Sequence, residues 1–143
     1  MPSPLLVPLL TPLLSAALIG AEPRWVVLDR LDGIETAVDD ASAERTDAGT
    51  VRVTLRFRYL RETPKNAPLW NKGVRSTLLD QEVECAADRR AQRLRVHRVW
   101  LTDGAGAVLA EKPAGGAWIP ASARGSVGAA YGGAICRRYA ERR

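Results

Sequence analysis

The chain has 143 residues and a formal net charge of +5, and 46% of its residues are hydrophobic while 26% are charged. These values exclude an intrinsically disordered protein and predict one domain with one modest hydrophobic core. The positive charge favours anionic partners, but it carries no information about the fold.

The first 21 residues, MPSPLLVPLLTPLLSAALIGA, carry no charged side chain. An apolar stretch that ends in small residues and is followed by the polar segment EPRW is typical of an export signal, here with cleavage near Ala21. About 18 apolar residues could instead span a bilayer as a lasting anchor. Pro4, Pro8 and Pro12 each disturb helical hydrogen bonding, which favours a cleaved signal. The sequence therefore predicts an exported chain whose single domain covers residues 22–143.

Six strands are expected in the rest of the chain, because short apolar or alternating runs are separated by turn residues. The aspartate–glycine pair at 32–33 predicts a hairpin between the first two strands, and the TDGAG turn predicts another between the last two. The polar segment 39–49, which has room for a helical turn, and segments 61–73 and 112–125 are expected to be loops. The expected strands cover residues 24–28, 34–38, 50–60, 76–85, 91–101 and 107–111.

Segment 50–60 gives the clearest strand pattern, because its residues alternate strictly between two faces. Val51, Val53, Leu55, Phe57 and Tyr59 would share one face, and Arg52, Thr54, Arg56 and Arg58 the other. The faces of segment 91–101 are mixed. An unbroken strand there would place Leu94, Val96 and Trp100 with Arg98, and Arg93, Arg95 and His97 with Val99 and Leu101.

The C-terminal segment 126–143 is predicted to be a helix. Val127, Tyr131, Ala134 and Ile135 recur at three- and four-residue spacings, Ser126 is a possible N-cap, and Arg137 and Arg138 suit the negative end of the helix dipole. Three glycines weaken this helix by about 1 kcal/mol each relative to alanine, which indicates close packing against a sheet. The fold class is therefore α+β, with an antiparallel sheet of about six strands and a C-terminal helix.

Cys85 and Cys136 are the two cysteines of the chain. An even pair in an exported protein favours a disulfide, whereas two separate buried thiols would suit a cytoplasmic protein. A bridge would close a loop of about 50 residues and stabilise the protein by about 4 kcal/mol in the chain-entropy model. It would join the end of the fourth expected strand to the helix.

Seven features in chain order resemble the surface-adhesin protein E family of small exported bacterial proteins. They are the strand that starts at Trp25, the aspartate–glycine turn, AGTVRV, EVECAADRRAQRLR, TDGAGAVLAE, WIPAS, and a helix that ends on Cys136. The resemblance covers most of residues 24–138. It implies an antiparallel sheet of about six strands with a C-terminal helix, paired cysteines, a periplasmic or cell-surface location, and adhesion to host matrix proteins. No cysteine follows the apolar stretch, so the lipid anchor of some members is not expected here.

No pattern in the sequence predicts catalysis, a metal or a cofactor. His97 is the single histidine and is expected to be a half-exposed surface residue. Asp39 and Asp40 lie in a loop and are expected to form a turn. The glycines of the GAG motif at 104–106 belong to a hairpin, because neither a following helix nor the spacing of a phosphate loop is present.

The arginines of two expected strands form the candidate binding site. If these strands share a sheet, Arg52, Arg56, Arg58, Arg93 and Arg95 make one basic face. Such a face either stays solvated and protects the sheet from edge pairing, or binds anionic groups through its guanidinium forks.

The basic face predicts the class of partner. Binding to lipopolysaccharide, a glycosaminoglycan or an acidic protein patch fits an exported chain, whereas nucleic acid is not expected. Trp70 and Trp118 lie in loops apart from the arginines and are expected at the edge of the core, the alternative being exposed contact residues. The predicted function is a non-enzymatic binding protein of the periplasm or cell surface that contacts host matrix protein or anionic envelope polymers. The alternative is a structural or accessory periplasmic protein with no ligand of its own.

Overall fold

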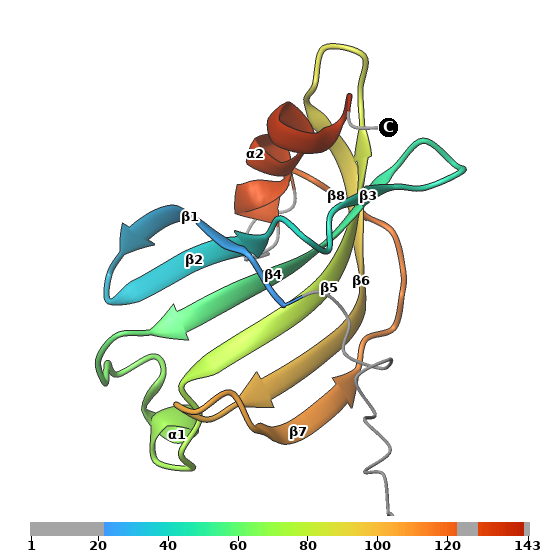
Figure 1. Cartoon of the computed structure of the whole chain (residues 1–143). Helices are drawn as coiled ribbons and strands as arrows, with labels where there is room; N and C mark the ends of the chain where they lie inside the picture. Colours follow the sequence, from blue (N-terminus) through green and yellow to red (C-terminus); the bar gives the residue numbers. More distant parts are fainter. Residues whose placement is uncertain (1–21, 123–128, 142–143) are drawn as a thin grey trace, which may run out of the picture.

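The computed structural model describes residues 22–122 and 129–141, which form one antiparallel sheet with a helix across one of its faces (Figure 1). The main strands pair in the order β1-β2-β4-β5-β6-β7, while β3 pairs with β4 and β8 pairs with β6. The strands are β1 (Trp25–Leu31), β2 (Ile34–Asp39), β3 (Glu44–Arg45), β4 (Val51–Tyr59), β5 (Ser76–Cys85), β6 (Ala91–Thr102), β7 (Val108–Pro113) and β8 (Ile119–Pro120). The helices are α1 (Ala67–Trp70) and α2 (Ala129–Tyr139).

The predicted fold class is confirmed, since an antiparallel sheet packs against a C-terminal helix and the chain holds one disulfide. Each of the six predicted strands corresponds to one of the six long strands. The short elements β3, α1 and β8 lie in segments predicted to be loops. The expected export signal (residues 1–21) and the expected N-cap Ser126 lie outside the described residues. None of the described helices is long and apolar enough to cross a membrane.

Side-chain hydrogen bonds explain why a helical turn forms in segment 61–73. The side chain of Asn66 accepts a hydrogen bond from the backbone N–H of Thr63 and donates one to the carbonyl of Arg61. Pro68 then lies in the first turn of α1, where a missing N–H costs no helical hydrogen bond. These contacts were not apparent from the proline and glycine content that predicted a loop.

Both predicted hairpins are present. Asp32 and Gly33 have φ values of 52° and 76°, the left-handed pair that a two-residue turn between twisted strands requires, and they join β1 to β2. In the turn between β6 and β7, the carboxylate of Asp103 accepts hydrogen bonds from the N–H groups of Ala105 and Ala107. The GAG motif therefore forms a hairpin turn, as predicted.

The hydrophobic core lies between α2 and the face of the sheet that it covers, here called the inner face. The alternation predicted for β4 is confirmed, because the apolar side chains of residues 51, 53, 55 and 57 are buried, Tyr59 is half-buried, and the arginines lie on the opposite, outer face. The fully or almost fully buried core residues include Val38, Val51, Val53, Leu55, Val83, Leu94, Ile135 and Tyr139.

A β-bulge in β6 changes which residues share a face. Arg98 pairs with Asp80 and Val96 pairs with Gln81, so His97 is the extra residue between them. The bulge places Arg98 and Trp100 on the outer face. The prediction that these two residues share a face with Leu94 and Val96 is wrong, because it assumed an unbroken strand.

Three attachments hold α2 to the sheet. The predicted disulfide is confirmed and joins Cys136 of α2 to Cys85 of β5. Near the start of the helix, the hydroxyl of Tyr131 donates to Asp29 of β1 at 3.0 Å and accepts from Thr36 of β2 at 3.1 Å. The hydroxyl of Tyr139 at the other end donates to Asp40 at 2.9 Å. The helix is therefore fixed to both the central and the first strands of the sheet.

Close packing of α2 gives a first prediction, for Gly132. A β-carbon there would lie 2.9 Å from Cβ of Ala91, whereas at Gly133 the nearest atom is the flexible guanidinium of Arg137 at 3.2 Å. Both alanine variants gain about 1 kcal/mol of helix propensity, but overpacking at Gly132 costs about 1–3 kcal/mol. Urea unfolding is expected to show Gly132→Ala less stable than Gly133→Ala by about 2 kcal/mol. Equal stability of the two variants would contradict this packing.

Candidate functional site

The outer face of the sheet brings together all five arginines of the predicted basic face. Arg52, Arg56 and Arg58 come from β4, and Arg93 and Arg95 come from β6, with β5 between these strands. Carboxylates from β2, β5 and β7 lie among them, which the sequence analysis did not include. They are Glu35, Asp80, Glu82, Glu84 and Glu111. The spacing of Asp80, Glu82 and Glu84 by two residues was the available signal, since it places all three on one face of a strand.

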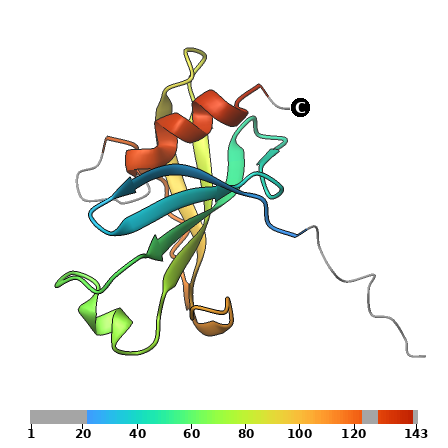
Figure 2. The ribbon, with the colours of Figure 1, turned by 60° about the vertical axis from the view of Figure 1, so that its left-hand side comes forward.

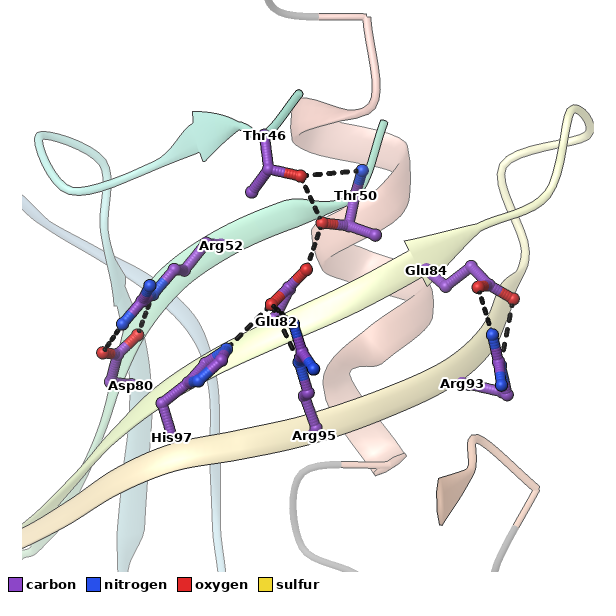
Figure 3. Close-up of polar contacts among 9 residues, drawn as sticks. All are labelled: Thr46, Thr50, Arg52, Asp80, Glu82, Glu84, Arg93, Arg95 and His97. Carbon is purple, nitrogen blue, oxygen red and sulfur yellow. Dashed lines mark hydrogen bonds and ion pairs between the residues drawn. The ribbon is translucent and has the colours of Figure 1, made fainter. Parts of the chain in front are cut away.

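One half of the outer face carries four arginines that each pair with a carboxylate: Arg52, Arg93, Arg95 and Arg98. Figure 3 shows the first three of these pairs. Arg52 binds Asp80 with two hydrogen bonds of 2.9 and 2.6 Å, and Arg93 binds Glu84 with two of 3.2 and 2.7 Å. Arg95 donates to Glu82 at 3.0 Å, and Arg98 pairs with Glu111 of β7. Bidentate ion pairs of this kind hold both side chains in a defined geometry. This half of the outer face is therefore close to neutral.

Glu82 is the centre of the neutral half (Figure 3). Its side chain is 6% exposed and accepts hydrogen bonds from Thr50, Arg95 and His97, the last at 2.8 Å. Burial alone would raise the pKa of Glu82, but these three hydrogen bonds and the charge of Arg95 lower it to about 2. Ionised Glu82 of β5 thus contacts β6 and Thr50, the residue directly before β4. His97 is 25% exposed, as a half-exposed residue was predicted to be, but it has a carboxylate partner that the sequence analysis did not identify.

The other half of the outer face carries excess positive charge. Arg30, Arg56 and Arg58 all pair with Glu35, which is 3% exposed, at 2.8, 3.4 and 3.1 Å. Burial raises the pKa of Glu35, but the hydrogen bond from Arg30 and the three positive charges outweigh burial and lower it. Burial and the neighbouring charge of Arg58 lower the pKa of Arg56. Three cations thus share one buried anion.

Arginine side chains also stack on tryptophan rings. Arg56 lies 4.3 Å from the centre of the Trp25 ring, Arg95 lies 4.4 Å from that of Trp118, and Arg75 lies 3.7 Å from that of Trp70. Such stacking stabilises a cation by about 0.5–1 kcal/mol at exposed sites. The expectation that Trp70 and Trp118 lie apart from the arginines is therefore wrong. Trp118 is far from Arg95 in sequence, and only the pairing of β8 with β6 brings them together.

A hollow of about 300 Å³ opens on the positive half of the outer face, here called the Trp25–Trp100 hollow. Arg56, Arg58 and Arg75 line it together with Asp103 and the hydroxyl residues Ser76 and Thr102. Arg75 donates to the carbonyls of Trp70 and Val74, and none of the described carboxylates pairs with it. Guanidinium forks beside aromatic rings suit an anionic group attached to a partly apolar one, such as an acidic sugar.

In residues 22–122 and 129–141, no three His, Cys, Asp or Glu side chains lie close enough to hold a metal ion. Asp39, at the end of β2, accepts hydrogen bonds from the N–H groups of Arg24 and Ala41, which is the turn-forming role predicted for it. Asp40 instead binds Tyr139 and pairs with Arg138, so it holds α2 to the sheet.

The comparisons with known proteins add no relative to this description. The Cys85–Cys136 disulfide is compatible with an exported protein, because such bonds persist in oxidising compartments. The resemblance to the surface-adhesin protein E family stays a prediction from the sequence features described above. No protein-family model, curated protein or solved structure matches the chain.

Proposed function

We propose that the protein is an exported, non-enzymatic binding module that contacts anionic polysaccharide or lipopolysaccharide through the positive half of its outer face. The observation that carries this proposal is the sharing of Glu35 by three arginines beside the Trp25–Trp100 hollow. A sulfate, phosphate or carboxylate group that enters the hollow would relieve the repulsion between neighbouring cations. The rings of Trp25 and Trp100 would pack against the apolar face of a sugar.

The geometry narrows the candidate residues within the basic face. Arg52, Arg93 and Arg95 are engaged by carboxylates of β5, and removing them from these partners would leave Asp80, Glu84 or the buried Glu82 without its cation. Arg56 and Arg58 have no described carboxylate partner besides Glu35. The ligand-binding residues of the proposal are therefore Arg56 and Arg58, with Arg75 added.

The proposed location and partners agree with three features of the chain. The disulfide suits an oxidising compartment, the first 21 residues resemble an export signal, and the resemblance to the surface-adhesin protein E family implies adhesion to host matrix protein. An acidic segment of a matrix protein offers the same carboxylate chemistry to the hollow, although it lacks the sugar ring that would stack on the tryptophans. We therefore rank the polysaccharide first.

One observation favours a structural or accessory protein with no ligand. Over β5 and β6 the arginines and carboxylates of the outer face pair with one another, and a paired surface attracts anions weakly. If the hollow also binds nothing, these ion pairs serve only to hold the strands and keep the sheet solvated.

Binding to heparin and to lipopolysaccharide tests the proposal. The double variant Arg58→Gln plus Arg75→Gln removes two cations of the hollow, and Arg45→Gln plus Arg137→Gln removes two exposed cations elsewhere. At about 0.15 M salt, where diffuse attraction is screened, we expect about a tenfold loss of affinity for the first variant and less than threefold for the second. Equal losses would assign binding to net charge alone. If the natural protein bound neither heparin nor lipopolysaccharide, the proposal would be wrong and the structural or accessory role would be the better explanation.

A further inference from the structure

A larger cleft lies on the inner face, on the opposite side of the sheet from the Trp25–Trp100 hollow. Its volume is about 580 Å³, within the range of small-molecule sites. The cleft is lined by the β1–β2 hairpin, the end of β4, the segment that carries α1, and the first turn of α2. Figure 2 shows the hairpin, α1 and the start of α2 on the left of the view. Helix α2 covers only part of the inner face, and the cleft lies on the part that α2 does not cover.

The floor and walls of the cleft are mainly apolar. Phe57 and Tyr131 lie with ring centres 5.8 Å apart, and Tyr59, Ile34 and Leu69 continue the lining. Both phenol hydroxyls are already hydrogen-bonded within the protein, because Tyr131 donates to Asp29 at 3.0 Å and Tyr59 pairs with the hydroxyl of Thr77 at 2.8 Å. The two tyrosines therefore offer mainly ring surface to the cleft.

The rim of the cleft has an unbalanced positive charge. Arg61 and Lys65 both line the cleft, and neither forms an ion pair within the part of the chain that the structure describes. The guanidinium of Arg61 lies over Gly33, 3.0 Å from where a β-carbon would stand, so this cation lies at the hairpin tip. Asp32 is the carboxylate among the described lining residues. Two cations thus face one anion at the mouth of an apolar cleft.

We propose that this cleft binds a single-chain amphiphile with a carboxylate head, of the fatty-acid class. The apolar chain would lie against Phe57, Tyr59 and Leu69, where burial of each methylene favours binding. The carboxylate would sit at the rim, within reach of Arg61 and Lys65. The exposed Leu31, whose surface is 65% accessible, would be covered by the bound chain. This ligand and this site are independent of the anion site on the outer face.

Titration calorimetry of the oxidised full-length protein with decanoate tests the proposal, with the uncharged decanol as the comparison. We expect saturable binding of one decanoate per chain, and about tenfold weaker binding of decanol. Arg61→Gln plus Lys65→Gln is expected to weaken decanoate binding about tenfold and to leave decanol binding unchanged. The matched pair Arg45→Gln plus Lys112→Gln, on β3 and β7, is expected to change neither.

A second variant tests the apolar wall without disturbing the core. Leu31→Asp places a carboxylate beside the bound chain and is expected to weaken decanoate binding more than tenfold. Leu109→Asp, at a residue that is 48% exposed on β7, is the matched control and is expected to have no effect. The proposal is overturned if the natural protein does not bind decanoate at millimolar concentration. It is also overturned if decanol binds equally well, or if the cleft variants bind decanoate as tightly as their controls.

Discussion

Loss of the Cys85–Cys136 disulfide is expected to lower the free energy of unfolding by about 4 kcal/mol, the largest effect of any change considered for this protein. The bridge joins positions 51 residues apart, so its removal allows the unfolded chain a large loop that it otherwise lacks. The intrinsic stability of α2 does not make up for this loss, because the helix contains two adjacent glycines and is weak by itself. Guanidinium unfolding of the oxidised protein and of Cys85→Ala plus Cys136→Ala measures the difference.

The reducing agent provides the control for this measurement. Dithiothreitol is expected to lower the stability of the natural protein almost to that of the double variant, and to leave the double variant unchanged. A stability difference below about 1 kcal/mol between the oxidised and reduced natural protein would show that the bridge restrains a chain already held by packing.

Replacing Glu82 by glutamine is expected to cost about 3 kcal/mol at neutral pH. Its pKa falls from an ordinary 4.5 to about 2 on folding, so ionised Glu82 stabilises the folded state. The sign follows from the direction of the shift: a lowered pKa gives stability that is complete above about pH 4.5. This contribution declines as the pH falls and is lost below about pH 2. Urea unfolding at several pH values is expected to show the natural protein and Glu82→Gln converging in acid.

Glu84 is the matched control for Glu82. It lies two residues further along β5 on the same face, also pairs with an arginine, and is 31% exposed where Glu82 is 6% exposed. The hydrogen bond and charge of Arg93 lower its pKa. Water screens such a pair, so Glu84→Gln is expected to change stability much less. If the two variants lost equal stability with equal pH dependence, the buried cluster around Glu82 would have no special role.

Most of the sheet could be predicted from the sequence because its signals are local. The strict alternation in β4 and the aspartate–glycine turn after β1 each depend on neighbouring residues only. The bulge at His97 could not be predicted in this way. Its only trace in the sequence is that apolar and charged residues are mixed on both expected faces of the strand, and an unbroken strand can give the same mixture. Its position depends on how β6 pairs with β5, where Val96 meets Gln81 and Arg98 meets Asp80.

The arginines of the candidate site could be predicted, but which carboxylate pairs with each arginine could not. Arg52 and Arg95 lie on their expected face, yet the carboxylates that pair with them come from β5. Which strand lies between β4 and β6 is a property of the topology, not of any one segment. The same holds for the stacking of Trp118 on Arg95 and for the cleft beside α1, which both arise where distant loops meet the sheet.

The position of the bridge has a mechanical consequence. A pulling force applied to the backbone after Tyr139 reaches Cys136 within three residues and passes through covalent bonds into β5. That strand pairs with β6 as far as Cys85 and with β4 as far as Val83, so a force that moves the strand meets the bonds to β6 first and then two rows of backbone bonds. Pulling on the C-terminal end of this protein must therefore break hydrogen bonds of the central strand β5 before α2 can separate from the sheet.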